Sequence, residues 1–411
     1  MNRQLSLPAP ATIVTRRRFL HRAGAATAGV LAAGGFIATG TVAGALLAAD
    51  ALTAEAAAMR DDAAIAREAD ALLTDAVRQQ LFRGSVLIAR AGKIVLHKGY
   101  DWADVAHHIP NTRHTRFRIA SITKQFTAMA ILQLQEQGKL HVHDLVSEHL
   151  PNTPAAWRQI TLQQLLTHTS GIPDYMNFPN FAAVMTRTLS PEQLIGLFRD
   201  KPLDFRPGSR WKYSNSGYNV LGYIVALRSG LSFPRFLQRH IFTPLGMADS
   251  GYDVNHPALP AHATGYASWT RPAAYMDISV AYADGSLYST VGDLYRWDQE
   301  VTSAHPRLVS RQTMREMFTP YVPTDASHPG SMAYGYGWYI GAQGGRRYID
   351  HTGDINGFLA DNGFFPDDKV TLIVLSNLES DAGLRQITGH LAGIIFGLAD
   401  CVEMRSPCVE M

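Results

Sequence analysis

Cysteine is almost absent from this chain of 411 residues, and its two examples stand in the last eleven positions. Cys401 and Cys408 each begin a Cys-Val-Glu-Met repeat, so we interpret 401–411 as a tail. A disulfide between them would close only a short terminal loop and could not organise the fold. The lack of cysteine elsewhere argues against a thiolate nucleophile or a cysteine-ligated metal centre.

The chain also lacks a strong charge of one sign and a Gly-x-Ser-x-Gly sequence. Its formal net charge is +2, and removal of residues 1–58, with five arginines and two acids, changes that charge to −1. A nearly neutral surface gives no electrostatic reason to expect nucleic acid or acidic lipid as a partner. Without Gly-x-Ser-x-Gly, the nucleophile turn of the α/β-hydrolases is excluded.

The first 58 residues form a separate compositional block. A basic region comes first, an uncharged stretch rich in alanine and glycine follows over 23–49, and small residues end the block. This order is typical of an export signal, and Thr-Arg-Arg-Arg-Phe-Leu at 15–20 resembles the twin-arginine consensus. We expect cleavage after Ala56 or Ala58 and a periplasmic or secreted protein. The apolar stretch is also long enough to span a bilayer, so an uncleaved anchor stays open.

The remaining sequence divides into strand-like and helical regions. Strand-like runs occur near both ends, around Ala91-Gly92 and in four runs between 334 and 377, and amphipathic helices occur at 63–81 and 384–396. Between them, helical spacing predicts helices at 121–137, 161–168, 191–199, 216–229 and 290–301. We therefore predict one domain over 59–400, with a sheet built from both chain ends and an inserted helical lobe at about 121–302. A cleft between the two lobes is where a site is expected.

Ser121 and Lys124 stand three residues apart at the start of a candidate helix that is apolar on several sides. At this spacing the two side chains share a face, and burial together with the positive end of the helix dipole lowers the pKa of the lysine. A neutral lysine can take the proton of a serine hydroxyl and activate it as a nucleophile. Taken alone, the pattern fits a capping serine with a snorkelling lysine better, since it is short and a second copy occurs at Ser209 and Lys212, within a turn.

A second polar group is Tyr213-Ser214-Asn215, just before another candidate helix. A tyrosine near a lysine can share its proton, and an amide such as Asn215 can orient a substrate carbonyl while it holds the lysine. A similar triplet, Tyr175-Met176-Asn177, lies in a loop and is interpreted as chance. For Tyr213 taken alone, an ordinary half-buried aromatic side chain is the better explanation.

The third group is His351-Thr352-Gly353, at the end of a strand-like run. An edge strand with threonine and glycine lets a substrate backbone lie alongside it. A backbone N–H beyond the glycine could then join that of Ser121 as an oxyanion hole. A simple turn between two strands would also explain Gly353 and Asp354.

In this order the three motifs resemble the active-site signature of the serine β-lactamase and penicillin-binding protein superfamily. The resemblance is strongest to the class C β-lactamase-like branch, with its esterases and D-amino-acid peptidases. It extends over roughly 80–380 through flanking sequences such as Leu-Leu-Thr-His-Thr-Ser-Gly, Ala-Asp-Gly-Ser-Leu-Tyr-Ser-Thr and Tyr-Gly-Tyr-Gly-Trp. It implies an α/β (α+β) fold of the β-lactamase/transpeptidase type, with an antiparallel sheet flanked by helices and an all-helical lobe.

The resemblance also implies a role for each residue of the site. Ser121 is expected to be the nucleophile, with Lys124 and Tyr213 as the proton network and Asn215 as the orienting amide. The backbone amides of Ser121 and Asp354 are expected to form the oxyanion hole. Members of the superfamily work without a metal or an organic cofactor, on small-molecule or cell-wall peptide substrates.

His351 departs from the pattern, because β-lactamases of this branch usually carry Lys-Thr-Gly there. A histidine is mostly neutral at pH 7, whereas a lysine is positively charged, so a histidine binds a substrate carboxylate less strongly. We expect an exported serine hydrolase that acylates Ser121 on an amide, lactam or ester carbonyl and releases the acyl group to water. Two alternatives stay open: a carboxylesterase without lactam or peptide activity, and a penicillin-binding sensor without turnover.

Other conspicuous residues are assigned structural roles. The pairs His107-His108 and His141/His143 are interpreted as solvated surface and not as metal ligands. His168 is expected to make a structural hydrogen bond. Four aromatic residues are expected to pack in the core, with Tyr218 also a candidate for the cleft wall: Trp211, Tyr218, Trp297 and Trp338.

Overall fold

The computed structural model describes residues 60–255, 261–328, 330–379 and 384–398. These residues belong to one compact unit that begins at Ala58. The expected export signal and the tail with both cysteines lie outside the described residues. Among the described helices, none combines the length and the apolar character needed to cross a membrane.

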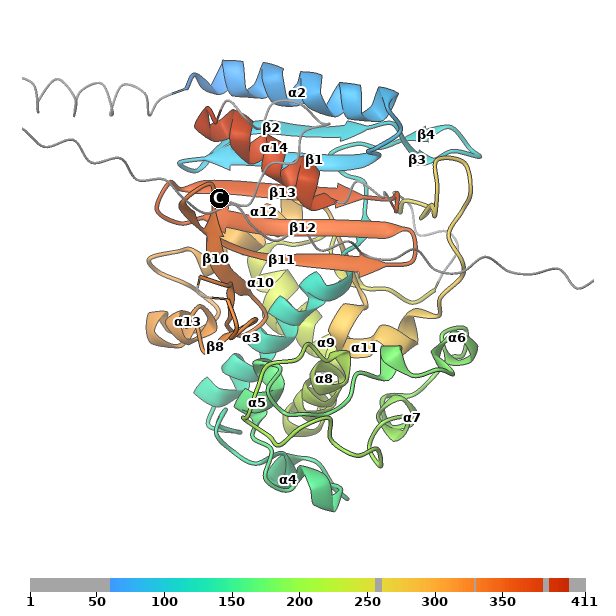
Figure 1. Cartoon of the computed structure of the whole chain (residues 1–411), viewed down its shortest axis with the longest axis vertical. Coiled ribbons are helices and arrows are strands. Elements are labelled where there is room, and N and C mark those ends of the chain that lie inside the picture. Colours follow the sequence, from blue (N-terminus) through green and yellow to red (C-terminus); the bar gives the residue numbers. More distant parts are fainter. Residues whose placement is uncertain (1–59, 256–260, 329, 380–383, 399–411) are drawn as a thin grey trace, which may run out of the picture. The chain divides into compact units, whose positions relative to one another are not determined.

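An antiparallel sheet of eight strands supports the site, in the order β2-β1-β13-β12-β11-β10-β9-β8 (Figure 1). Its strands are β1 (Gly84–Arg90), β2 (Lys93–Tyr100), β8 (Val322–Pro323), β9 (Ala333–Tyr334), β10 (Tyr339–Gln343), β11 (Arg346–Ile355), β12 (Phe358–Phe365) and β13 (Val370–Ser376). β1 pairs with β13 along its whole length, from Gly84↔Ser376 to Arg90↔Val370. The prediction of one sheet built from both chain ends is therefore confirmed.

Helices cover both faces of this sheet. α2 (Asp62–Arg78) and α14 (Leu384–Phe396) pack on one face, and α12 (Val291–Val301) packs on the other (Figure 1). Because side chains alternate along a strand, β1 contributes to both cores. Val86 and Ile88 pack with α2 and α14, whereas Leu87 and Ala89 pack with the helical lobe.

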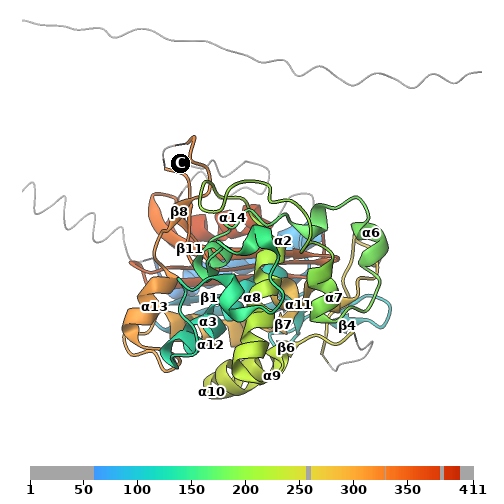
Figure 2. The same cartoon turned by 90° about the horizontal axis from the view of Figure 1, so that it is seen from below.

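The inserted lobe is mainly helical (Figure 2). Its longest helices are α3 (Thr123–Glu136) and α8 (Asn215–Ser229), which contact each other. Shorter helices complete the lobe and its connection to the sheet: α4 (Val146–His149), α5 (Leu162–Leu166), α6 (Phe181–Val184), α7 (Pro191–Gly196), α9 (Phe233–Leu237), α10 (Thr243–Leu245), α11 (Tyr282–Gly285) and α13 (Arg311–Met317). Single turns are η1 (Ala120–Ile122), η2 (Ala155–Trp157), η3 (Tyr175–Asn177), η4 (Gln238–Phe242) and η5 (Ile278–Ala281).

The expectation of an all-helical lobe was wrong in one respect. A three-stranded sheet joins β5 (Phe117–Arg118), which comes just before this region, to β7 (Leu287–Ser289) and β6 (Gly251–Tyr252), which lie within it. Strands of two or three residues are too short for an alternating pattern to appear in the sequence. A further pair, β3 (Trp102–Asp104) with β4 (Ile109–Pro110), follows the first hairpin.

Candidate active site

Ser121 lies in η1, immediately before α3. The preceding residue, Ala120, has φ 45°, a left-handed conformation that residues with a side chain rarely adopt. Strand β11 packs directly against this turn, because a Cβ on Gly353 would lie 2.2 Å from the carbonyl oxygen of Ile119. No side chain caps the start of η1 or α3, so the alternative of a capping serine is not supported. The tight contact with Gly353 holds the strained turn in place.

Lys124 points its side chain inward from the first turn of α3 and is 0% exposed. Its Nζ lies 3.0 Å from Ser121 Oγ, 2.7 Å from Asn215 Oδ1 and 2.9 Å from the backbone oxygen of Asp284. Every residue from Thr123 to Leu134 is buried, as predicted for this helix. The snorkelling alternative for the lysine is therefore wrong.

The burial of Lys124 changes its acidity. Desolvation lowers its pKa to about 8, and the nearby carboxylates of Asp284 and Asp174 oppose this shift. A substantial fraction of the amine is then neutral in mildly alkaline solution and can accept the proton of Ser121.

Tyr213 lies beside this pair. Its ring centroid is 4.8 Å from Lys124 Nζ, and burial raises the pKa of its phenol well above the usual value, although interaction with Ser121 opposes the rise. The phenol is therefore protonated at neutral pH. Lys124 is therefore the group that can act as a base. Tyr213, which stays protonated, can act as an acid or as a proton relay.

His168 fixes the segment that carries Tyr213. Its Nδ1 accepts a hydrogen bond of 3.1 Å from the backbone N–H of Ser214, and its ring centroid lies 4.3 Å from that of Tyr213. The side chain is buried, and desolvation lowers its pKa well below the usual value. The prediction of a structural hydrogen bond for His168 is confirmed.

His351 is buried on β11 and both of its ring nitrogens are engaged. Nδ1 donates to the backbone oxygen of Thr352 at 2.7 Å, so Nε2 accepts from the hydroxyl of Tyr334 at 3.0 Å. Burial, with the charge of Lys124, lowers the pKa of His351 to about 3. The imidazole is neutral throughout the physiological range, which strengthens the sequence argument against a cation at this position.

The segment from His351 to Asp354 presents a strand edge to the helical lobe. The pairing between β10 and β11 ends at Tyr339↔Asp350, whereas β12 pairs with β11 as far as Ile355. One edge of this segment thus has no strand neighbour in the part of the chain that the structure describes. An extended substrate can align there, as the sequence predicts for this motif.

A cavity of about 450 Å³ brings the predicted residues together. Most of them line it: Ser121, Tyr213, Asn215, His351, Thr352 and Asp354. Lys124 lies behind Ser121, and Gly353 is buried against η1. All eight residues predicted from the sequence therefore lie at one site.

Neither of the two duplicate motifs forms a second site. Lys212 is exposed and pairs with Asp204 at 2.5 Å, so the second Ser-x-x-Lys copy is a surface feature. Tyr175 is buried and donates to Asp284 at 3.0 Å, which makes it a support for the site and not a second copy of it.

Sequence reasoning missed two buried carboxylates that support the site. Asp174 accepts from Asn215 Nδ2 at 3.0 Å, and Asp284 accepts from Asn219 at 2.7 Å. Burial raises the pKa of Asp284 to about 7, although the charge of Lys124 opposes the rise. The sequence contained one signal for Asp284, since it lies within the matching Ala-Asp-Gly-Ser segment, but nothing there connected it with Lys124.

The aromatic residues follow expectation with one exception. Tyr218, Trp297 and Trp338 are fully buried, whereas Trp211 is partly exposed and packs on the rings of His168 and Tyr213. Trp211 therefore packs behind Tyr213 and His168 and is not part of the fully buried core.

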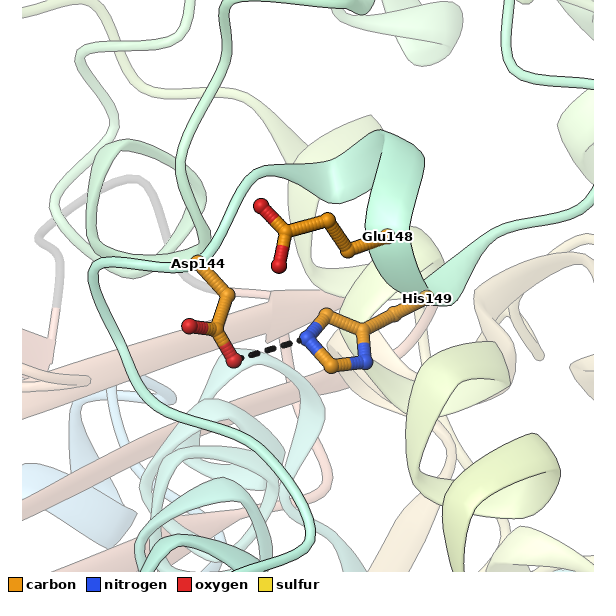
Figure 3. Close-up of side chains that lie close together, drawn as sticks. All are labelled: Asp144, Glu148 and His149. Atoms are coloured by element: carbon orange, nitrogen blue, oxygen red, sulfur yellow. Dashed lines mark hydrogen bonds and ion pairs between the residues drawn. The ribbon is translucent and has the colours of Figure 1, made fainter.

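Figure 3 shows a cluster of polar side chains on α4 and on the loop that precedes it. Ligand atoms of Asp144, Glu148 and His149 lie within 4.8 Å of one another. Asp144 pairs with His149 Nε2 at 2.9 Å, and Glu148 accepts from the backbone N–H of Leu145. These local hydrogen bonds explain the cluster without a metal. The nearby His141 and His143, as well as His107 and His108, are exposed, as predicted.

Comparisons with known proteins agree with this geometry. The Beta-lactamase family model matches residues 61–394. The Bacillus subtilis protein PbpX, named as a penicillin-binding protein, is 35% identical over 313 residues, which cover 75% of this chain and 74% of the relative. A penicillin-binding protein from Bacillus halodurans has a TM-score of 0.68 and 28% identity over 79% of this chain and 98% of that one. D-amino acid amidase from Ochrobactrum anthropi, in complex with D-phenylalanine, shares the fold, with a TM-score of 0.71 at 22% identity over 81% of this chain and 99% of that one.

The fold and the buried Ser-Lys pair define a serine hydrolase with the β-lactamase/transpeptidase-like architecture. The chain belongs to the Beta-lactamase family, within the serine β-lactamase and penicillin-binding protein superfamily. The sequence prediction of family and fold is confirmed.

Proposed function

We propose that this chain hydrolyses an amide, lactam or ester through an acyl-enzyme on Ser121. The observation that carries the proposal is the 3.0 Å contact between Ser121 Oγ and the buried Nζ of Lys124. In the first step, Lys124 takes the hydroxyl proton, Oγ bonds to the substrate carbonyl carbon, and the bond to the leaving group breaks. The proton passes through Lys124 and Tyr213 to the leaving nitrogen or oxygen.

The negatively charged oxygen of the tetrahedral intermediate must be stabilised by hydrogen-bond donors. The backbone amides of Ser121 and Asp354 are the proposed oxyanion hole, because η1 and β11 are packed together at Gly353. Asn215 holds Lys124 with its oxygen, and its Nδ2 donates to Asp174. Asn215 would therefore act on substrate chiefly by positioning the lysine.

The second step releases the acyl group to water. A water molecule gives its proton to Lys124, directly or with Tyr213 as the relay, and attacks the ester carbonyl. The bond from Oγ to carbon then breaks, and Ser121 takes the proton back from Lys124. The alternative without this step is a penicillin-binding sensor. It is a candidate because two relatives are named as penicillin-binding proteins. The class C-like branch and export through the 1–58 segment remain part of the proposal.

A plain esterase is the second candidate, and His351 favours it. Both ring nitrogens already have partners, so this residue has no hydrogen to offer a substrate carboxylate. Penicillins and terminal D-alanine peptides carry such a carboxylate, whereas short esters do not.

A substrate panel on protein that begins at residue 59 tests the proposal. It contains a chromogenic cephalosporin, a D-alanine dipeptide and a short-chain nitrophenyl ester, with Ser121→Ala as the blank. We expect repeated turnover of the ester and slower turnover of the cephalosporin. A single burst equal to the enzyme concentration would support the sensor, and faster cephalosporin hydrolysis would support a β-lactamase. Turnover that persists in Ser121→Ala would refute the mechanism.

A further inference from the structure

The charged side chains of the catalytic cavity are all acidic. Among its described lining residues none is a lysine or an arginine, whereas Asp354 and Glu379 both line it, as does the buried Asp284. Lys124 is buried behind the nucleophile, and its three hydrogen bonds are taken by Ser121, Asn215 and Asp284. A substrate anion in this cavity therefore finds no free cationic partner among the described residues.

Asp354 and Glu379 lie on one side of the nucleophile. Gly353 packs against the turn that carries Ser121, so the nucleophile faces the middle of the 351–355 segment. His351 lies on one side of that point, with its ring centroid 6.1 Å from that of Tyr213. Asp354 lies on the other side, followed by the turn at Gly357 that Glu379 contacts.

This placement separates the two parts of a substrate. The leaving group must lie near Tyr213, since that residue is the proposed proton donor. The acyl group then extends the other way, toward Asp354 and Glu379. Met276 and Ile355 also line the cavity and provide apolar surface for the methylene groups of an acyl chain.

The two carboxylates are held near each other. Glu379 Oε1 accepts from the N–H of Gly357 at 2.5 Å, which fixes its side chain at the end of β11. Partial desolvation raises the pKa of Asp354, and the negative charge of Glu379 raises it further. Both residues line the cavity and are exposed to solvent. Two like charges close together are stabilised when a cation lies between them.

We propose that the enzyme selects substrates whose acyl group carries a positive charge, such as an ammonium, with Asp354 and Glu379 as the specificity-determining residues. The proposal rests on the function proposed above, because it places the acyl group by the role of Tyr213. A purely structural role for Glu379, as the acceptor for Gly357, would leave substrate charge without effect.

Three nitrophenyl esters with the same chain length test it: 6-ammoniohexanoyl, heptanoyl and the monoanion of heptanedioyl. At pH 8.0 and low salt we expect kcat/KM for the ammonium ester to exceed that for the neutral ester about five- to twentyfold, with the anionic ester slowest. The preference should shrink as NaCl is raised, because salt screens charges at a partly exposed site. Rates with Ser121→Ala supply the uncatalysed background.

Two substitutions locate the effect. Glu379→Gln keeps an acceptor for Gly357 and removes the charge, so the ratio of ammonium to neutral kcat/KM should fall at least threefold, with a further fall when Asp354→Asn is added. Asp200→Asn removes an exposed carboxylate elsewhere in the helical lobe, 84% of whose side chain is accessible, and should keep the wild-type ratio.

Equal rates for the three esters, with hydrolysis that still depends on Ser121, would overturn the charge selectivity and leave the proposed function intact. An unchanged ratio in the double variant would likewise overturn the assignment to these residues. Hydrolysis of none of the three esters would overturn the charge selectivity, and it would overturn the proposed function as well if the cephalosporin and the D-alanine dipeptide are not turned over either.

Discussion

The Nζ of Lys124 lies 3.0 Å from the Oγ of Ser121, at the start of a helix that is buried on all sides through Leu134. The same nitrogen contacts Asn215 and the backbone oxygen of Asp284. Burial in this position favours the neutral form of the lysine. The neutral amine can then accept the hydroxyl proton of the serine.

The acid limb of the pH–rate profile should report Lys124. Its pKa of about 8 means that the neutral amine, and with it the acylation rate, increases as the pH rises through about 8. The charge of Asp284 raises this pKa, so Asp284→Asn should lower it and move the limb to lower pH by about half a unit or more. The measurement is kcat/KM for a neutral ester between pH 6 and 10.

Asp200→Asn is the matched control, because it removes an exposed carboxylate and should leave the midpoint in place. A midpoint that stays at its wild-type value in Asp284→Asn, or moves upward, would contradict the electrostatic coupling between Asp284 and Lys124.

Gly353 should tolerate no side chain. A Cβ there would lie 2.2 Å from the carbonyl oxygen of Ile119 and 3.1 Å from the Cβ of Ala120, so Gly353→Ala must push β11 away from the nucleophile turn. We expect a loss of about 1–3 kcal/mol in the free energy of unfolding and at least a tenfold fall in kcat/KM. Urea denaturation and ester kinetics on the same preparation measure both.

The control for this change is Gly196→Ala. A Cβ at Gly196 meets no atom within 4 Å, and this residue ends α7, so alanine should be neutral or slightly stabilising. Wild-type activity in Gly353→Ala would show that the contact between β11 and η1 does not position Ser121.

Much of this arrangement could be predicted from the sequence, because the relevant patterns are local. The apolar spacing after Ser121 indicated a buried helix, and Ala91-Gly92 indicated the first hairpin, whose turn has φ of 48° and 80°. The meeting of Lys124 with Asn215 was not local, and only the resemblance connected the motifs. The contact of Gly353 with Ile119 could not be predicted at all, since it depends on how two distant backbones pack.

The acidic side of the cavity was missed for a related reason. Glu379 follows the last strand and is separated from Ser121 by more than two hundred positions, and it belongs to no motif. Its closeness to the site results from the antiparallel register that returns β13 beside β1 and β12. Likewise, the sequence indicated that His351 is mostly neutral. It could not show that both ring nitrogens have hydrogen-bond partners, because one partner is Tyr334, whose position depends on the fold.

His351 should make the fold sensitive to acid. Its pKa is about 3 in the folded chain and about 6.5 in the unfolded chain, so between these values the unfolded state binds more protons. Its contribution to stability is therefore lost as the pH falls below 6.5, at up to about 1.4 kcal/mol per unit. Between pH 7.5 and 5.0 the wild type should lose about 2 kcal/mol more than His351→Gln, as measured by urea denaturation.

Buried acids such as Asp350 and Asp361 have raised pKa values and act in the opposite direction, so the comparison is made between variants and not from the wild type alone. His305→Gln, at an exposed histidine, should reproduce the wild-type loss. An equal loss in His351→Gln would mean that His351 is protonated in the folded protein.

The central claim is that Ser121, and no other serine, becomes acylated. The chain supplies its own control, because Ser209 begins a second Ser-x-x-Lys copy whose Lys212 is exposed and paired with Asp204. Protein that begins at residue 59 is treated with a fluorescent penicillin or a fluorophosphonate, and the labelled peptide is identified by mass spectrometry. The account predicts label on Ser121, its complete loss in Ser121→Ala and its retention in Ser209→Ala; label that persists in Ser121→Ala would contradict it.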